Sequence, residues 1–409
     1  MDEPSLFGMP AAKGRWLLVL CGMLINLCLG SIYAWSVFVA PLTAHFTESL
    51  GREVTATEVL MPFSVFLLVF AVTMPLAGRL IESLGPAKTA ALGGVLTGLG
   101  WIFASFAGSV EALYLGYGVV GGVGVGIAYG VPVAVSTRWF PDRRGLAVGL
   151  TVLGFGFSAV VTANLAGLLI EAVGVMATFR VFGLAFLLLL VILALPLSFP
   201  PGQGLAATGV AACEFDRGRM LRTRAFYGLW GCYFIGCLAG LMAISIARPV
   251  GTEVAGIEPA LATALVGFFA VFNGGGRPLF GAFTDRFTPR AAAMLSFFLI
   301  GAASLAMWWY PVPATYVVAF ALLWGCLGGW LALAPAATAQ FFGTCDYPRC
   351  YGVVFLAYGA GALAGPQFAG LVRTTTGGYL GVFPVVAVLA LVGLVTAFAL
   401  LRPPSEAPG

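Results

Sequence analysis

The sequence predicts an all-α membrane protein with twelve transmembrane helices, arranged as two pseudo-symmetric six-helix bundles with both termini in the cytoplasm. Composition, the spacing of apolar segments and an internal repeat lead to this prediction. Of the 409 residues, 60% are hydrophobic and only 9% are charged, whereas about 25% of the residues in a soluble domain are charged. So few charges cannot cover a water-facing surface, and lipid must therefore surround most of the chain.

Twelve apolar segments reach the roughly 20 residues that a membrane-spanning helix needs. The first follows Lys13 and Arg15 and is too long for a signal peptide, so it is predicted to be an anchor. The longest polar interruption predicts a cytoplasmic linker at residues 200–224, between an N-terminal bundle at 1–199 and a C-terminal bundle at 225–409. The predicted spans are residues 16–40, 57–81, 88–108, 112–137, 145–170, 177–199, 225–248, 260–284, 291–310, 313–341, 351–373 and 379–401.

The distribution of positive charge predicts the orientation, because cytoplasmic loops of membrane proteins are enriched in Lys and Arg. With the N-terminus inside, 15 of the 20 basic residues fall on the cytoplasmic side. Four fall outside, namely Arg52, Arg180, Arg248 and Arg373, and Arg277 lies within a span. Both termini are therefore predicted to be cytoplasmic.

The two halves contain an internal repeat. Gly78 and Gly281 lie 203 positions apart, as do Glu82 and Asp285, and Pro132 and Pro335. Each glycine begins a Gly-x-x-x-acid pattern at the end of the second helix of its half. A constant offset at several landmarks predicts two parallel repeats of six helices.

Glycines recur every four residues in the predicted fourth helix, at Gly118, Gly122, Gly126 and Gly130. This spacing places them on one face, where another helix can approach closely. A dinucleotide-binding loop would follow a strand, and these glycines lie inside an apolar span. Close helix packing is therefore the favoured interpretation.

Other function classes lack the residues that they need. The eight cysteines have no metal-ligand spacing, and His45 is the sole histidine, so no metal, cofactor or enzymatic centre is expected. A net charge of +4 is too small to indicate nucleic-acid binding. Nothing indicates the symmetric, charged or carbonyl-lined pore of a channel. These observations favour a transporter in the lipid bilayer, and we expect it to be a monomer.

Arg277 is the main candidate for substrate binding. It lies eight residues before Asp285, which marks the cytoplasmic end of the eighth helix, and hence about 12 Å into the apolar region at 1.5 Å per residue. A charged side chain near the bilayer centre costs about 2.5–3.5 kcal/mol or more and usually has a function. The sequence places no acidic residue in the middle of a span, so the substrate is predicted to be the anion. A guanidinium group matches a carboxylate.

Asn273 lies one turn before Arg277, on the same face of the helix. Its amide could bind the substrate or could cap the backbone groups that Pro278 leaves unpaired, and the sequence favours neither. The run Gly274-Gly275-Gly276 before Arg277-Pro278 predicts a bent or partly unwound helix.

The Gly-x-x-x-Glu/Asp loops resemble the cytoplasmic signature of the major facilitator superfamily. The resemblance implies that each carboxylate caps or pairs with a neighbouring helix end and stabilises one state of a gate. Glu82, Asp285 and Arg286 are therefore predicted to be gating residues. The alternative is a solvated turn.

Several segments resemble the bacterial oxalate:formate antiporters and, more distantly, the eukaryotic monocarboxylate transporters. They are Ser31–Ser36, Gly126–Gly130, Arg138–Ala147 and Asn273–Arg277. The resemblance covers most of the chain, is most specific at 126–147 and implies a bacterial inner-membrane location.

This resemblance also implies where the substrate site lies. Tyr33 and Tyr129 match aromatic residues of the cavity wall, and Arg277 matches a basic residue of helix 8. A second basic residue of the antiporters, in helix 11, aligns with Tyr358, and Phe355 matches an aromatic residue one turn earlier. Trp324 and Trp330 cannot share one helical face, and Trp330 is the preferred wall residue.

One fixed cation suits one carboxylate, because a second carboxylate would be buried without a partner. The resemblance, with one fixed cation in place of two, therefore implies alternating-access transport of a small monocarboxylate such as lactate, pyruvate, acetate or formate. Proton linkage is the preferred coupling, and Glu58, Glu111 and Glu258 at helix ends are candidate proton sites. Obligatory carboxylate exchange and transport of a small neutral solute are the alternatives.

Overall fold

The computed structural model describes residues 5–201 and 215–404, and almost all of its regular structure is helical. A short antiparallel pair, β1 and β2, precedes the first helix. The elements are β1 Ser5–Leu6, β2 Met9–Pro10, α1 Ala11–Leu29, the 3-10 helix η1 Gly30–Ala34, α2 Trp35–Leu50, α3 Ala56–Leu84, α4 Pro86–Ala104, α5 Val110–Leu113, the π-helix η2 Tyr114–Gly121, α6 Gly122–Trp139, α7 Arg144–Val173, α8 Val175–Ala194, α9 Arg217–Met220, α10 Arg224–Pro249, the π-helix η4 Val250–Val254, α11 Pro259–Arg286, α12 Pro289–Trp309, α13 Pro313–Phe342, α14 Tyr347–Thr376 and α15 Val382–Leu400.

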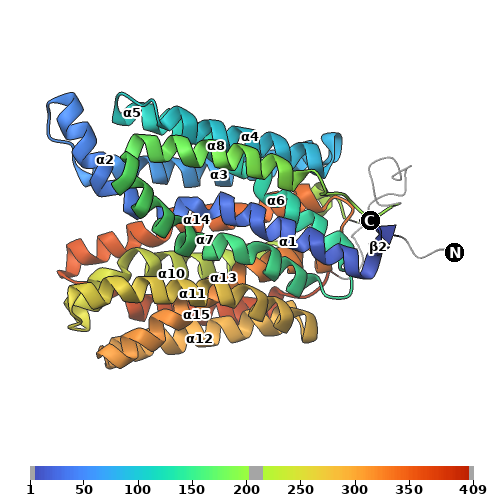
Figure 1. Ribbon diagram of the computed structural model, residues 1–409. Helices are drawn as coiled ribbons and strands as arrows, with labels where there is room; N and C mark the ends of the chain where they lie inside the picture. The colour runs from blue at the N-terminus through green and yellow to red at the C-terminus, as the bar shows by residue number, and fades with distance from the viewer. Residues whose placement is uncertain (1–4, 202–214, 405–409) are drawn as a thin grey trace. The chain divides into compact units, whose positions relative to one another are not determined.

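Within the described residues, twelve helical segments are long and apolar enough to cross a membrane, which confirms the predicted number. The first is longer than predicted, because α1, η1 and α2 form one run of 40 residues, Ala11–Leu50. In each half of the chain these helices run side by side (Figure 1).

Glycine and proline residues mark the helix ends. Gly85 and Gly174 have positive φ angles of 79° and 82°, which lets the chain reverse between α3 and α4 and between α7 and α8. Proline stands in the first turn of α4, α11, α12, α13 and α14. At that position proline gives up only an N–H group that has no partner within the helix.

The chain divides into two compact units, and α7 contributes to both. The beginning of α7 belongs to the second unit and the remainder belongs to the first. The bundle and linker boundaries expected from the sequence stay a prediction. Unit 1 comprises Met1–Phe140 and Gly154–Ala211, and unit 2 comprises Pro141–Leu153 and Ala212–Gly409.

In unit 1 the glycine repeat of η2 and α6 faces α3, as the spacing predicts. A Cβ atom would lie 2.9 Å from the Phe66 carbonyl oxygen at Gly122 and 2.7 Å from Thr73 Cβ at Gly126, and one at Gly118 would also meet α3. The glycines therefore allow the helix backbones to approach one another closely.

Replacing Gly122 by valine is expected to lower the thermal unfolding temperature and the yield of folded protein. Its Cβ would collide with α3, and overpacking of this kind costs about 1–3 kcal/mol. Gly167→Val is the matched control, because a Cβ at Gly167 in α7 would meet nothing within 4 Å. Equal unfolding temperatures for the two purified variants would contradict this packing.

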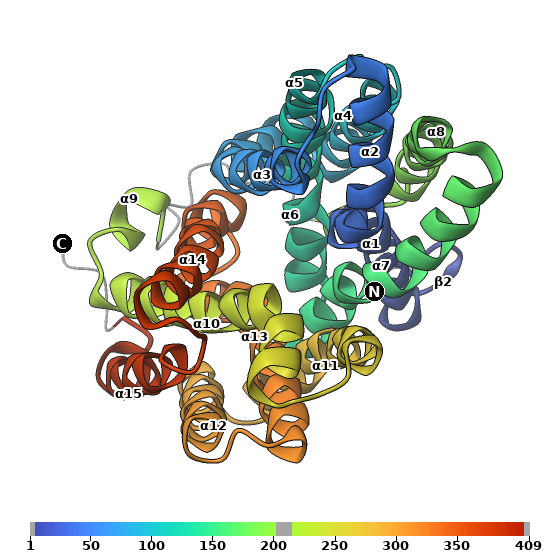
Figure 2. The ribbon, with the colours of Figure 1, turned by 90° about the vertical axis from the view of Figure 1, so that its left-hand side faces the viewer.

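In unit 2 the helices α12 and α11 each pack along one neighbouring helix. Figure 2, in which the helices are seen nearly end-on, shows α12 beside α15 and α11 beside α13. Glycines permit the second contact, because a Cβ at Gly276 would collide with the Gly325 backbone and one at Gly328 would collide with the Asn273 backbone. Arg277 therefore lies on a helix that is held firmly against α13.

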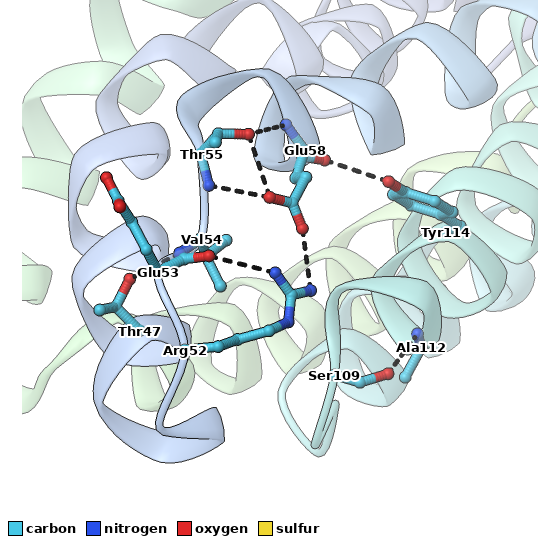
Figure 3. Close-up of polar contacts among 9 residues, drawn as sticks. All are labelled: Thr47, Arg52, Glu53, Val54, Thr55, Glu58, Ser109, Ala112 and Tyr114. Atoms are coloured by element: carbon cyan, nitrogen blue, oxygen red, sulfur yellow. Dashed lines mark hydrogen bonds and ion pairs between the residues drawn. The ribbon is translucent and has the colours of Figure 1, made fainter.

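The loop between α2 and α3 is fixed by the polar contacts drawn in Figure 3. Thr55 and Glu58 form a reciprocal capping box at the start of α3. The Glu58 carboxylate also forms an ion pair of 2.8 Å with Arg52. Tyr114 donates a hydrogen bond of 3.2 Å to the Glu58 carbonyl oxygen. Glu58 thus acts as a structural anchor between this loop and the start of η2.

Candidate functional site

The side chain of Arg277, which belongs to a membrane-spanning helix, is fully buried. Arg277 is 0% exposed, and it lies within α11, nine residues before the end of that helix at Arg286. Its Nη1 donates a hydrogen bond of 2.6 Å to the Val152 carbonyl oxygen in α7. Its Nη2 donates one of 3.2 Å to Asn273 Oδ1. Both of these acceptors are neutral, so these two hydrogen bonds orient the guanidinium group without cancelling its charge.

The first turns of α7 lie directly against α11, from this arginine to the end of that helix. A Cβ at Gly149 would lie 2.5 Å from the Arg277 carbonyl oxygen and 2.8 Å from Pro278 Cα. Gly145 and Gly281 make the same kind of approach closer to the helix ends. Because no side chain separates the two backbones here, the Val152 carbonyl can reach the guanidinium group.

Asn273 connects Arg277 to the neighbouring helix α13. Its Oδ1 accepts from Arg277, and its Nδ2 donates a hydrogen bond of 3.2 Å to the Trp324 carbonyl oxygen. Asn273 is itself buried, with 4% of its surface exposed. Neither contact is a cap for the backbone groups around Pro278. The amide instead fixes the position of the guanidinium group.

Of the two expectations for Gly274–Pro278, the partly unwound segment is wrong, and the bend stays a prediction. α11 is one α-helix from Pro259 to Arg286, with Pro278 inside it. The three glycines had suggested flexibility, but Gly276 is needed for the close contact with α13 at Gly325. Packing on both sides keeps the segment helical.

In unit 1 the structure brings Tyr33 and Tyr129 together through a residue that the sequence did not single out. Both rings pack edge-on against Phe155 of α7, with centroid distances of 5.0 and 5.4 Å. Phe70 of α3 lies 5.3 Å from Tyr129 and completes the cluster. The sequence Gly154-Phe155-Gly156-Phe157 could have drawn attention to this position, because aromatic residues between glycines have room to contact several helices.

In unit 2, Phe355 and Tyr358 of α14 stack on each other at 5.0 Å, and both are almost fully buried. Trp330 lies elsewhere in this unit. Its ring packs on Tyr233 and Phe297 and covers Gly236. These contacts place Trp330 in the packed interior between helices, and its role in the wall of the substrate cavity stays a prediction.

The predicted gating residues differ in how they are held. Asp285 at the end of α11 accepts hydrogen bonds from the backbone N–H groups of Gly145 (2.7 Å) and Leu146 (2.8 Å), so it caps the start of α7. Glu82 at the end of α3 interacts electrostatically with Arg138. Arg286 is exposed and lies over the Phe287 ring at 5.8 Å. The cap at Asp285 is observed, and a gating role for all three stays a prediction.

Within residues 5–201 and 215–404, a helical fold with twelve candidate spans is that of a multi-pass membrane protein. The comparison with known proteins gives its family. The profile of the Major Facilitator Superfamily matches residues 19–342 and 252–409, and the chain belongs to this superfamily.

Relatives by sequence include several carriers of organic anions. The chain is 31% identical over 370 residues to the oxalate:formate antiporter of Oxalobacter formigenes, covering 89% of this chain and 86% of the antiporter. It is 25% identical to apicoplast pyruvate carrier 1 of Toxoplasma gondii, covering 84% and 81%. It is 24% identical to monocarboxylate transporter 12 of Xenopus laevis, covering 93% and 88%. These relatives confirm the family that the sequence motifs resemble.

Solved structures confirm the fold. The proton:xylose symporter XylE aligns with a TM-score of 0.75 at 13% identity, covering 96% of this chain and 97% of the symporter. The transporter FucP in its outward conformation also aligns with a TM-score of 0.75, at 15% identity, covering 93% and 97%.

Proposed function

We propose that this protein is a secondary active transporter of a small organic monocarboxylate in the bacterial inner membrane, working by alternating access. The substrate class comprises lactate, pyruvate, acetate and formate. The observation that carries the proposal is the fully buried guanidinium group of Arg277 in a spanning helix. A cation at this depth is costly and usually serves transport.

The chemistry of Arg277 supports an anionic substrate. A guanidinium group presents a planar fork of N–H donors that pairs with the two oxygens of a carboxylate. The contacts to Val152 and Asn273 hold that fork in one orientation. The relatives support the same class, since their names include an oxalate:formate antiporter and a pyruvate carrier.

Tyr358 favours a substrate with one carboxylate. By resemblance, this position holds a second basic residue in the oxalate carriers. In this chain the position is a buried tyrosine stacked on Phe355. A dicarboxylate would bring a second negative charge into the site without a fixed cation at Tyr358 to balance it.

The resemblance to the monocarboxylate transporters makes proton linkage the preferred coupling, and obligatory exchange of carboxylates is the second candidate. Asn273 favours exchange, because an amide beside Arg277 cannot take up a proton. The antiporter relative favours it too. Of the candidate proton sites, Glu58 is already engaged by Arg52 and Thr55, and Glu111 is hydrogen-bonded to Ser109, which leaves Glu258 as the better candidate.

Uptake of labelled lactate into proteoliposomes tests the proposed function and separates the two couplings. The proposal predicts uptake into empty vesicles that an inward proton gradient accelerates. Uptake that needs lactate inside the vesicles and ignores the gradient would establish exchange. Vesicles that take up a neutral solute but no carboxylate would overturn the proposal.

Replacing Asn273 by aspartate is expected to make uptake strongly pH-dependent. The new carboxylate would lie one turn from Arg277, where Asn273 Oδ1 now accepts a hydrogen bond, and would neutralise the cation whenever it is ionised. Uptake should therefore be low near neutral pH and rise as the pH falls and the aspartate takes up a proton. Asn164→Asp, at an exposed asparagine of α7, is the matched control. A flat pH profile for the Asn273 variant would contradict the account.

A further inference from the structure

A second basic site lies in unit 2, at the ends of α11, α12 and α15 and the start of α7. A cavity of about 530 Å³ opens here, and its lining includes Arg144, Arg290 and Arg402. By the predicted topology this is the cytoplasmic side of the protein. The cavity is separate from Arg277, which does not line it.

The charged groups of this lining leave an excess of positive charge. The two carboxylates that face the three arginines are Asp142 and Asp285, so the formal charge is positive. Asp285 already accepts hydrogen bonds from two backbone N–H groups of α7. Moreover, α7 and α12 both begin at the cavity, and helix N-termini carry partial positive charge.

Two of the arginines have donor atoms that the protein does not use. Nε of Arg144 and Nε of Arg290 are both buried and have no hydrogen-bond partner. Nη1 of Arg144 donates a hydrogen bond of 3.3 Å to the Ala339 carbonyl oxygen, and Asp285 interacts electrostatically with the same guanidinium group. A buried donor without a partner is costly, and an anion in the cavity would satisfy such donors.

An apolar stripe on α15 leads to this cavity. Val388, Leu391, Val395 and Phe398 are exposed and lie on one face of the helix. The stripe ends at Phe398, and the guanidinium group of Arg290 lies 4.3 Å above that ring. A molecule with an anionic head and apolar chains would fit this combination of stripe and cavity.

We propose that the cavity binds a phosphate-bearing anion, and that its occupant is the headgroup of an anionic phospholipid with acyl chains lying along α15. Basic pockets between transmembrane helices on the cytoplasmic side are suited to such headgroups. Arg290 and Arg402 bind the phosphate from the lipid-facing side of the cavity, and Arg144 binds it from the start of α7.

Lipid retention by the purified, delipidated full-length protein tests this site. The protein is mixed with phosphatidylglycerol or with phosphatidylcholine of the same acyl chains, and bound phosphorus is measured after gel filtration. Wild-type protein is expected to retain phosphatidylglycerol preferentially. The double variant Arg290→Gln and Arg402→Gln should retain it roughly tenfold less, whereas the double lysine variant should keep most of the binding.

Arg222→Gln is the matched control, because Arg222 is an exposed arginine of the same unit that does not line the cavity. Equal retention of both lipids by the wild-type protein, or unchanged retention by the double glutamine variant, would overturn the site. The wild-type comparison holds even if a variant does not fold.

A third arm adds inorganic phosphate. If phosphate displaces the lipid only at phosphate concentrations far above that of the lipid, the result supports the phospholipid as the occupant. Displacement at equal concentration would overturn the lipid as occupant and leave free phosphate.

Discussion

Replacing Arg277 by glutamine is expected to lower carboxylate uptake at least 100-fold. Glutamine keeps a polar side chain but removes the charge and the fork of donors. Each of two charge-assisted hydrogen bonds contributes about 1.5–3 kcal/mol to substrate binding. The loss of both corresponds to a reduction in uptake of at least 100-fold. Arg277→Lys keeps the charge and loses the planar geometry, so intermediate uptake is expected. Initial rates in proteoliposomes at low substrate concentration measure the difference.

The control for this prediction is Arg248→Gln. Arg248 is an exposed arginine of α10 whose contact is a hydrogen bond to Thr263, and its loss should leave uptake close to that of the wild-type protein. Thermal unfolding of each purified variant checks that the protein is folded. Near-normal uptake by a folded Arg277→Gln variant would rule out the guanidinium group as the carboxylate-binding group.

Replacing Asp285 by asparagine is expected to weaken the start of α7 and to reduce uptake about tenfold. The substitution removes a negative charge from the helix N-terminus and weakens the cap that holds Gly145 and Leu146. Caps of this kind contribute about 0.5–2 kcal/mol, and the favourable charge–dipole interaction adds to that. The first turns of α7 also present the Val152 carbonyl to Arg277, so fraying should reach the proposed substrate site.

Trypsin cleavage at Arg143 and Arg144 measures how often the start of α7 opens, which uptake alone does not show. The protein in nanodiscs should be cut there faster when Asp285 is replaced, because the first turn of α7 opens more often. Glu171→Gln, at the exposed far end of the same helix, should leave both cleavage and uptake unchanged. If cleavage and uptake were the same for the Asp285 variant and the wild-type protein, the cap would have no part in gating.

Most of the fold could be predicted because lipid imposes simple rules. A helix must be long and apolar to cross a bilayer, and twelve such segments were visible in the sequence. The repeat of Gly118, Gly122 and Gly126 predicted a close helix contact, and the structure shows these glycines against α3. The helical state of Gly274–Pro278 could not be predicted, because it depends on the packing of Gly276 against Gly325.

The candidate site could be predicted only in part. Arg277 stood out because a charge inside an apolar span is rare. Its acceptor at Val152 is a backbone carbonyl, and a sequence pattern does not show which carbonyl a folded chain will present. Phe155 was missed because only its flanking glycines distinguish it in the sequence, and its contacts to Tyr33 and Tyr129 depend on the fold.

Direct ligand binding tests, without the complications of transport, whether the Arg277 guanidinium group binds a carboxylate. Purified wild-type and Arg277→Gln proteins would be titrated with lactate and with its uncharged amide, using the ligand-induced shift in unfolding temperature. Wild-type protein is expected to show a saturable shift with lactate and none with lactamide, and the variant is expected to show none with either ligand. Equal shifts with lactate and lactamide, or an undiminished lactate shift in the variant, would contradict carboxylate binding by Arg277.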